Sequence, residues 1–152
     1  MYGGGEIGRK FVQDVQAYGG ILTEKDLRDY RVEWRDSVNT TIIDNSTIHT
    51  MPLPSSGSML LLMLNMLRDY DIQPNALGYH RITEAFKIAF AHRSWIGAEE
   101  TDAVKEIIRK MAMKDYADVK KSLIHDDKTN SNTSFYEANN GTDIDDHGTA
   151  HL

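Results

Sequence analysis

The apolar run Met59–Leu67 constrains the fold of this chain more than any other feature, because only Asn65 interrupts it. Crossing a bilayer takes roughly 20 apolar residues, so the run is too short to span a membrane. A helix that is apolar on every side is stable only where other elements cover it. The sequence therefore predicts a deeply buried helix from Met59 to about Arg68.

The segment before this helix contains Pro52, Pro54 and a cluster of serines. The two prolines predict an extended backbone, and Ser55 or Ser56 is placed to cap the helix. A nucleophilic serine is the alternative interpretation. The sequence disfavours it, because the cluster lacks the G-x-S-x-G pattern and has no base close by in the sequence.

Apolar spacing and turn residues predict the remaining elements. Toward the N-terminus they are a helix with an apolar face of Ile7, Phe11, Val15 and Tyr18 that ends at Gly19-Gly20, a short helix capped by Thr23 with Asp26, and two or three antiparallel strands between Arg31 and Met51. Further along they are a helix from about Asn75 to Ile96 with a stripe of Ile82, Phe86, Ala89 and Phe90, a helix from about Thr101 to Met113, and a short helix around Tyr116, Val119 and Leu123. The expected fold class is α+β, mostly helical, with a short antiparallel β region at about residues 31–51.

Composition narrows the functions open to the chain. A net charge of −6 over 152 residues provides no basic face for nucleic acid, so no nucleic-acid partner is expected. With no cysteine, disulfides, zinc-thiolate sites and thiol catalysis are excluded. Residues Met1–Glu6 have neither the basic nor the apolar region of a signal peptide. No targeting or transmembrane segment is therefore predicted within the chain.

Four Asn-x-Ser/Thr sequons, at Asn39, Asn45, Asn132 and Asn140, are candidates for N-glycosylation. All four fall in segments expected to be turn, edge strand or loop, where a glycan fits. The segment from His125 to Asp146, rich in acidic and small polar residues, is expected to be a long loop. Loops of that length in a compact domain are usually functional or disordered.

The C-terminal stretch Asp145–Leu152 admits three interpretations. It can be a turn at Gly148 that enters a strand. It can also be a metal site, because His147 and His151 lie on one side of an extended chain, near two aspartates. The third interpretation is a self-cleaving junction between Gly148 and Thr149.

The junction interpretation has a defined chemistry. Gly148 lacks a side chain, so the Thr149 hydroxyl can approach the Gly148 carbonyl and the backbone can be held in a strained conformation. Attack gives an ester by an N→O acyl shift, and hydrolysis leaves Thr149 as a new N-terminus. Its α-amine has an ordinary pKa of about 7.7–8.0 and can accept the proton of its own hydroxyl. One residue then supplies both nucleophile and base.

The chain resembles the γ-glutamyltranspeptidases (glutathione hydrolases) of the N-terminal-nucleophile hydrolase superfamily. The matching stretches are Gly19–Tyr30 (GGILTEKDLRDY), Met51–Gly57 (MPLPSSG) leading to Leu64–Leu67, Tyr79–Lys87 (YHRITEAFK) through Arg93, and Asp146–Leu152 (DHGTAHL). They occur in family order at family-like spacings and cover essentially the whole chain. Together they are highly specific, and they favour the self-cleavage interpretation of Thr149.

The resemblance implies that residues 1–148 are the C-terminal part of the large subunit and residues 149–152 the first residues of the small one. The fold it implies is part of an αββα sandwich, with a truncated strand after residue 148. Thr149 would be the catalytic nucleophile, Gly148 and Thr149 the autocleavage junction, and His151 a candidate for supporting the site. No cofactor or metal is required.

The substrates implied are glutathione and other γ-glutamyl compounds, with water, an amino acid or a dipeptide as acceptor. The small subunit of the same precursor is the expected partner. The parent protein is expected to be a plasma-membrane ectoenzyme or a secreted protein, in keeping with the sequons.

The chain departs from the family pattern in two respects. Gly97-Ala98-Glu99 stands where the family commonly has Gly-Asp-Pro. The family's arginine for the substrate carboxylate, its oxyanion-hole glycines and its γ-glutamyl-binding residues have no match within these 152 residues. The fragment is therefore expected to be inactive alone. The alternative is a non-catalytic remnant that acts as a binding module.

Overall fold

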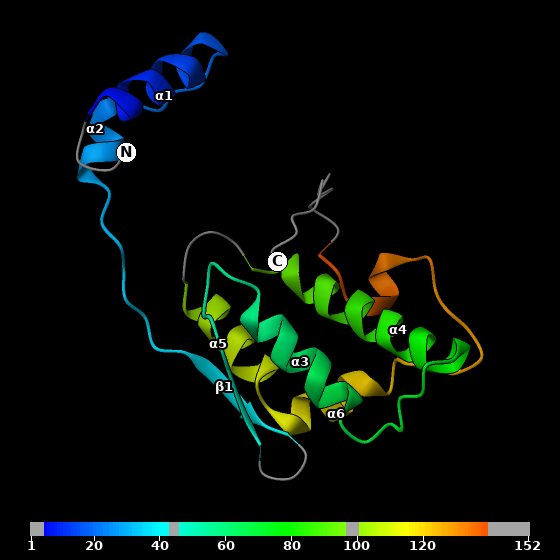
Figure 1. Cartoon of the computed structure of the whole chain (residues 1–152). Helices are drawn as coiled ribbons and strands as arrows, with labels where there is room; N and C mark the ends of the chain where they lie inside the picture. Colours follow the sequence, from blue (N-terminus) through cyan, green and yellow to red (C-terminus); the bar gives the residue numbers. More distant parts are fainter. Residues whose placement is uncertain (1–4, 43–45, 97–100, 140–152) are drawn as a thin grey trace. The chain divides into compact units, whose positions relative to one another are not determined.

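The computed structural model describes residues 5–42, 46–96 and 101–139 (Figure 1). By their contacts the residues fall into two compact units, Met1–Arg35 and Asp36–Leu152. The first unit contains α1 (Glu6–Ala17) and α2 (Glu24–Asp29). The second contains β1 (Val38–Thr41), β2 (Thr47–Thr50), α3 (Gly57–Leu67), α4 (Ala76–Arg93), α5 (Asp102–Met111), α6 (Lys114–Lys121) and the 3₁₀ helix η2 (Thr133–Tyr136). The mostly helical α+β class is confirmed.

In the first unit, local signals set the ends of the helices as predicted. After α1, Gly19 adopts φ 83°, and the Gly19 and Gly20 amides donate to helix carbonyls at 3.0 and 2.9 Å. This pattern is a Schellman motif, which suits glycine because the left-handed conformation crowds a Cβ. Thr23 and Asp26 form the reciprocal capping box that begins α2.

The face predicted to be buried on α1 is not the buried one. Ile7 is 69% exposed and Tyr18 is 94% exposed, whereas Gly8 and Val12 are buried. Within its unit α1 contacts α2, which covers only part of the helix. The apolar stripe is therefore wider than the surface that α2 can cover.

The predicted β region is a two-stranded antiparallel hairpin in which Val38 faces Thr50 and Thr41 faces Thr47. Residues 31–37 form no strand, although Val32 and Trp34 favour β structure. Both side chains lie largely in solvent, at 65% and 94% exposure. A strand forms only against a neighbour, and these residues have none among those described.

Helix α3 occupies the centre of the second unit and contacts α4, α5, α6 and both strands (Figure 1). Its side chains at Leu61, Leu62 and Met66 are completely buried. Burying one such side chain contributes about 1.5–3 kcal/mol, so the helix dominates the core energetically. The prediction of a deeply buried helix is confirmed, with Leu60 as an exposed exception at 41%.

Asn65, the one polar residue in the apolar run, joins three elements inside the core. It is fully buried, and its amide nitrogen donates to the Ala112 carbonyl after α5 at 3.2 Å. The Thr40 hydroxyl of β1 lies 3.3 Å from its amide oxygen. A buried amide is tolerated when both ends have partners. Asn65 therefore sets how the hairpin and α5 sit on α3.

The start of α3 differs from the prediction. Residues Pro52–Ser55 form a turn, with a cis Leu53–Pro54 peptide and a hydrogen bond from the Ser55 amide to the Pro52 carbonyl at 3.0 Å. The backbone is therefore not extended here. Ser56 is the N-cap residue, but its side chain makes no capping hydrogen bond. The turn brings Gly57 against the end of β2, and this close packing decides where the helix begins.

Helix α4 buries only part of its predicted apolar stripe. Ala89 of the stripe is fully buried, whereas Phe86 and Phe90 are 48% and 55% exposed. The face toward the core carries Ala85 and Ile88 beside Ala89, and all three are fully buried. Small side chains allow α3 and α4 to approach closely, so packing against α3 selects the alanine face over the phenylalanine face.

His92 of α4 is a buried polar residue in the interface with α6. Its Nδ1 is 2.8 Å from the Ile88 carbonyl, and its Nε2 is 2.6 Å from the Tyr116 hydroxyl. The Ile88 carbonyl can only accept, so Nδ1 donates to it, and in the neutral ring Nε2 accepts from the tyrosine. Burial lowers the pKa of His92, and the nearby Lys120 charge acts in the same direction.

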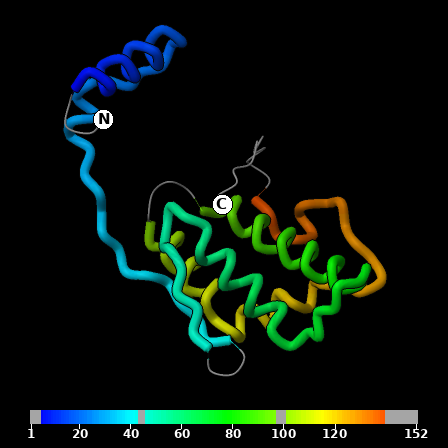
Figure 2. Tube along the Cα trace, in the orientation of Figure 1, coloured from blue at the N-terminus to red at the C-terminus, as the bar shows by residue number. Residues whose placement is uncertain are grey.

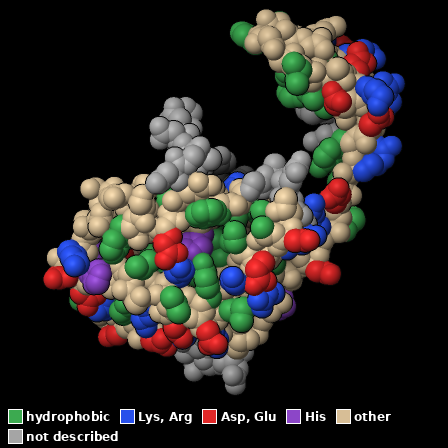
Figure 3. All heavy atoms as spheres, turned by 180° about the vertical axis from the view of Figure 1, so that it is seen from behind, with side chains coloured by type: hydrophobic (Ala, Val, Ile, Leu, Met, Phe, Trp, Pro, Cys, Tyr) green, Lys and Arg blue, Asp and Glu red, His purple; other side chains and the backbone are tan. Residues whose placement is uncertain are grey.

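The surface of the second unit mixes charge and apolar groups. On the face seen in Figure 3, acidic, basic and hydrophobic side chains are interspersed. Several charged side chains of this unit are paired, as in Arg68–Asp118 at 2.5 Å and Lys121–Asp69 at 3.2 Å. No described helix has both the length and the apolar content needed to cross a bilayer.

Replacing Gly57 with alanine should destabilise the second unit by about 1–3 kcal/mol, because overpacking forces the backbone to shift. A Cβ at this position would lie 2.1 Å from the Met51 carbonyl oxygen and 2.8 Å from Thr50 Cγ2. Urea denaturation checks this. The adjacent Ser56→Ala is the control and should change stability by less than about 0.5 kcal/mol. Equal midpoints for the two variants would contradict the close packing.

Stability should fall as pH decreases through the region below about 6.5, where unfolded histidine gains its proton. Native His92 has a lowered pKa, so protons bind preferentially to the unfolded chain in that window. Each bound proton changes the free energy of unfolding by at most about 1.4 kcal/mol per pH unit. Thermal melts between pH 7.5 and 5.5 measure the effect. His92→Gln should flatten the slope of stability against pH. Tyr116→Phe should lower stability at every pH and leave that slope unchanged. The same slope in wild type and His92→Gln would disprove the assignment.

Candidate functional site

Residues 125–139, which we call the strap, run along α4 in the same direction as the helix (Figures 1 and 2). Three tethers follow one another in order. His80 Nε2 bonds the His125 carbonyl at 2.7 Å, and Arg81 forms a two-pronged ion pair with Asp126 at 2.8 and 2.6 Å. Next come the contacts of Glu84 and Lys87, and then those of Ser94 and Trp95.

The middle tether is a cluster around a buried carboxylate. Glu84 is 2% exposed, and it accepts hydrogen bonds from the Thr129 hydroxyl at 2.6 Å and the Tyr136 hydroxyl at 2.7 Å. Lys87, one turn further along α4, donates to Glu84 at 3.0 Å and to the Asn130 carbonyl at 2.7 Å. A buried carboxylate that has a counter-charge and several hydrogen-bond donors makes the cluster rigid.

Lys87 is the residue with the most partners in this cluster. The three N–H groups of its ammonium are shared among four acceptors, because the Thr129 and Tyr136 hydroxyl oxygens also lie 2.6 Å away. The ammonium lies 4.4 Å from the centre of the Tyr136 ring. Burial raises the pKa of Glu84, but the three hydrogen bonds and the Lys87 charge outweigh it and leave the pKa below its usual value. Burial lowers the pKa of Lys87, and the same partners reverse that and raise it. Both groups are therefore charged at neutral pH.

The last tether fixes the end of the strap. The Trp95 indole donates to the Glu137 carbonyl at 2.7 Å, and the Asn139 amide donates to the Ser94 hydroxyl at 2.7 Å. Lys120 of α6 pairs with the Glu137 carboxylate. Glu137 has φ 64°, a left-handed conformation that a non-glycine residue holds at a cost of about 1 kcal/mol or more. Contacts on both its backbone and side chain hold it there.

The strap is the described part of the long loop predicted from His125 to Asp146, with η2 as its one helical turn. Residues 125–139 are held against α4, and Tyr136 is 3% exposed. The predicted nucleophile Thr149, its neighbour Gly148, the candidate His151 and the expected strand after residue 148 lie outside the described residues. The metal alternative at residues 145–151 lies outside them too. The structure therefore describes the approach to the junction, up to Asn139.

Two of the four sequons can be placed. Asn39 is exposed on β1, opposite His49, and Asn132 is exposed at the start of η2, where its side-chain oxygen accepts from the Ser134 amide at 3.0 Å. Asn45 and Asn140 lie outside the described residues. Glycosylation at all four sites stays a prediction.

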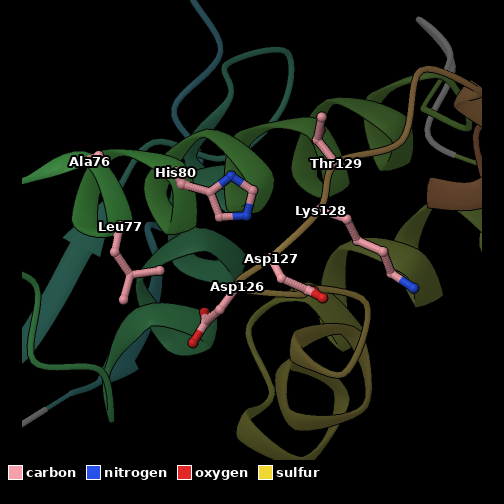
Figure 4. Close-up of a pocket in the computed structure, with 7 residues that line it drawn as sticks. All are labelled: Ala76, Leu77, His80, Asp126, Asp127, Lys128 and Thr129. Carbon is pink, nitrogen blue, oxygen red and sulfur yellow. The ribbon is translucent and has the colours of Figure 1, made fainter.

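An open hollow of about 500 Å³ lies where the first turn of α4 meets the start of the strap (Figure 4). Its lining includes His80, Asp126 and Lys128, and Figure 4 shows His80 over the strap. His80 and Asp126 are engaged by the first tether, which gives them a structural role. In the described ranges, no three histidine or acidic side chains gather as a metal site requires.

Sequence reasoning did not single out Glu84 and Lys87 as an anchoring pair. They sit three residues apart on a helix, which commonly indicates a solvated ion pair. Two features indicate a buried contact instead of a solvated ion pair. Glu84 is next to Ala85, which is buried, and Phe135-Tyr136 is the only aromatic pair in a polar segment. Neither identifies the partner, because the contacts join residues 45 and 52 positions apart.

Comparison with known proteins places the chain. The family model described as gamma-glutamyltranspeptidase matches residues 1–152. Glutathione hydrolase 2 of Arabidopsis thaliana is 36% identical over 152 residues, covering 97% of this chain and 26% of that protein. The acylase ACY 1 proenzyme of Pseudomonas sp. strain V22 is 35% identical over 127 residues, covering 80% of this chain and 22% of that protein.

Among solved structures, the gamma-glutamyltranspeptidase of Helicobacter pylori superimposes with a TM-score of 0.70 and 27% identity, covering 96% of this chain and 42% of that one. The chain thus spans about a quarter of the length of the curated relatives it matches. The predicted resemblance and the predicted fold class are both confirmed. This chain belongs to the γ-glutamyltranspeptidase family.

Proposed function

We propose that the parent protein is a γ-glutamyl hydrolase and transferase, and that it matures by cutting itself between Gly148 and Thr149. The observation that carries this proposal is the family match over residues 1–152, which includes the stretch DHGTAHL around the junction. Two kinds of named relatives support it, glutathione hydrolases and a proenzyme.

The proposed maturation step is an intramolecular acyl transfer. Thr149 Oγ forms a bond to the Gly148 carbonyl carbon, the peptide C–N bond breaks, and the Thr149 nitrogen takes up the hydroxyl proton. Water then hydrolyses the ester, leaving a carboxylate on Gly148 and a free hydroxyl and amine on Thr149. Residues 1–148 become the end of the large subunit, and Thr149 begins the small one.

In the proposed catalytic cycle, Thr149 Oγ attacks the γ-carbonyl of glutathione or another γ-glutamyl compound. The α-amine of Thr149 takes the hydroxyl proton and delivers it to the leaving amine. Water resolves the γ-glutamyl ester to glutamate, and an amino acid or dipeptide amine resolves it to a new γ-glutamyl amide. An isolated chain of residues 1–152 should be inactive, because oxyanion donors contribute several kcal/mol and have no match here.

Mass spectrometry of the freshly synthesised full-length protein tests the junction. We expect two products that meet between Gly148 and Thr149, and no cleavage in Thr149→Ala, because the nucleophile is removed. Thr142→Ala is the matched control, since Thr142 also follows a glycine, and it should cleave like the wild type. An uncut wild-type protein would favour the non-catalytic remnant. Cleavage that survives in Thr149→Ala would rule out the assigned nucleophile.

The acylase relative makes the donor a separate question, which two synthetic amides can answer. A γ-glutamyl anilide and a glutaryl anilide differ only in the α-amino group. If the parent is a γ-glutamyl enzyme, the cut protein should hydrolyse the γ-glutamyl anilide at least about tenfold faster. The glutaryl anilide leaves the groups that bind the α-ammonium without a partner, which costs well over 1.4 kcal/mol of binding free energy. A preference for the glutaryl compound would assign the parent to acylase chemistry instead.

A further inference from the structure

The strap contacts α4 at three places, which follow the order of the helix from its first turns to its C-terminal end. Position 126 is tied to helix position 81, positions 129, 130 and 136 to positions 84 and 87, and positions 137 and 139 to positions 95 and 94. Figure 2 shows the two segments side by side, and the hydrogen bonds place them in contact. The path of the strap is therefore fixed from its start after α6 to Asn139, which lies beside the C-terminal end of α4.

The Glu84–Lys87 pair is the central point of this attachment. Glu84 is 2% exposed, while the Lys87 side chain is 31% exposed. Removing the Lys87 ammonium would leave Glu84 buried without its counter-charge and would take a partner from residues 129, 130 and 136. In the first tether Asp126 is half exposed, and exposed ion pairs hold less firmly. The last tether includes the largely buried Lys120 and adds to the attachment.

We propose that the Glu84–Lys87 pair is a positioning device for precursor cleavage: it holds the strap on α4 so that the chain departs beside Ser94 only nine residues before Gly148. This inference rests on the proposed self-cleavage at Gly148–Thr149. Glu84 and Lys87 act through the strap and are positioning residues, without contact to the reacting atoms.

The length of the tether gives the size of the effect. From Asn139 to Gly148 the chain has nine residues and can reach at most about 30 Å. With the strap released as far as Asp126, the tether grows to 22 residues and its reach to about 75 Å. The tether sets the effective concentration of the junction near the folded unit from which the strap departs. This concentration falls roughly as the −3/2 power of tether length, so cleavage should slow by roughly fourfold.

The test is a time course of precursor cleavage in the full-length protein made by cell-free translation. Lys87→Met combined with Trp95→Phe should slow cleavage at Gly148–Thr149 by roughly two- to fourfold. Lys87→Met alone should slow it less, because the last tether still holds residues 137 and 139. Tyr136→Phe is a milder variant that keeps the ring and removes the bridging hydroxyl, and it should slow cleavage less. Lys87→Arg retains the charge and should recover part of the rate.

Lys121→Met is the matched control. Lys121 also pairs with a carboxylate, Asp69, and also lies 4.4 Å from the centre of a tyrosine ring, Tyr70, but it does not touch the strap. It should cleave at the wild-type rate even if its thermal stability falls as far as that of Lys87→Met. Once cut, the Lys87→Met protein should hydrolyse a γ-glutamyl anilide with unchanged kcat/KM, because the tether no longer exists.

Each outcome separates the two proposals. A wild-type precursor that does not cut at Gly148–Thr149 overturns the proposed function and this inference together. A wild type that cuts, with Lys87→Met and Lys121→Met cutting equally fast, overturns the inference alone. Slower cleavage accompanied by an equal loss of kcat/KM in the cut protein also overturns it, because the pair would then serve general stability.

Discussion

The second unit depends on the need to cover one apolar helix on every side. α3 has no polar face, so α4, α5, α6 and the hairpin must all pack against it for it to be stable. Asn65 shows how a single polar group is accommodated there, with partners on β1 and after α5. Hydrophobic burial supplies the driving force, and this amide supplies the specificity of arrangement.

Two features decided within one turn of helix could be predicted from the sequence. The capping box at Thr23 and the glycine end of α1 depend on residues at most a few positions apart. Features that depend on distant neighbours could not. Trp34 has strand propensity without a strand partner, and α4 presents alanines to the core because α3 must come close.

The candidate site could also be predicted only in part. Thr149 could be proposed because several stretches along the chain together resemble one family. The Gly-Thr pair alone did not single it out, since Gly141-Thr142 has the same two residues. The anchoring role of Glu84 could not, because its partners Thr129 and Tyr136 lie 45 and 52 residues away. Only the fold brings them together. Polar contacts of this kind resist prediction because any exposed hydroxyl is an equally good partner in the sequence.

α4 precedes the strap in the sequence, so the ribosome makes the helix before the segment that packs along it. α4 is complete at Arg93, and Asn139 is synthesised 46 residues later, a delay of roughly 2–9 s at ~5–20 residues per second. Each stretch of the strap emerges after the helical turn that receives it, so it can dock cotranslationally onto a surface that already exists. The junction at Gly148–Thr149 is synthesised after the whole strap.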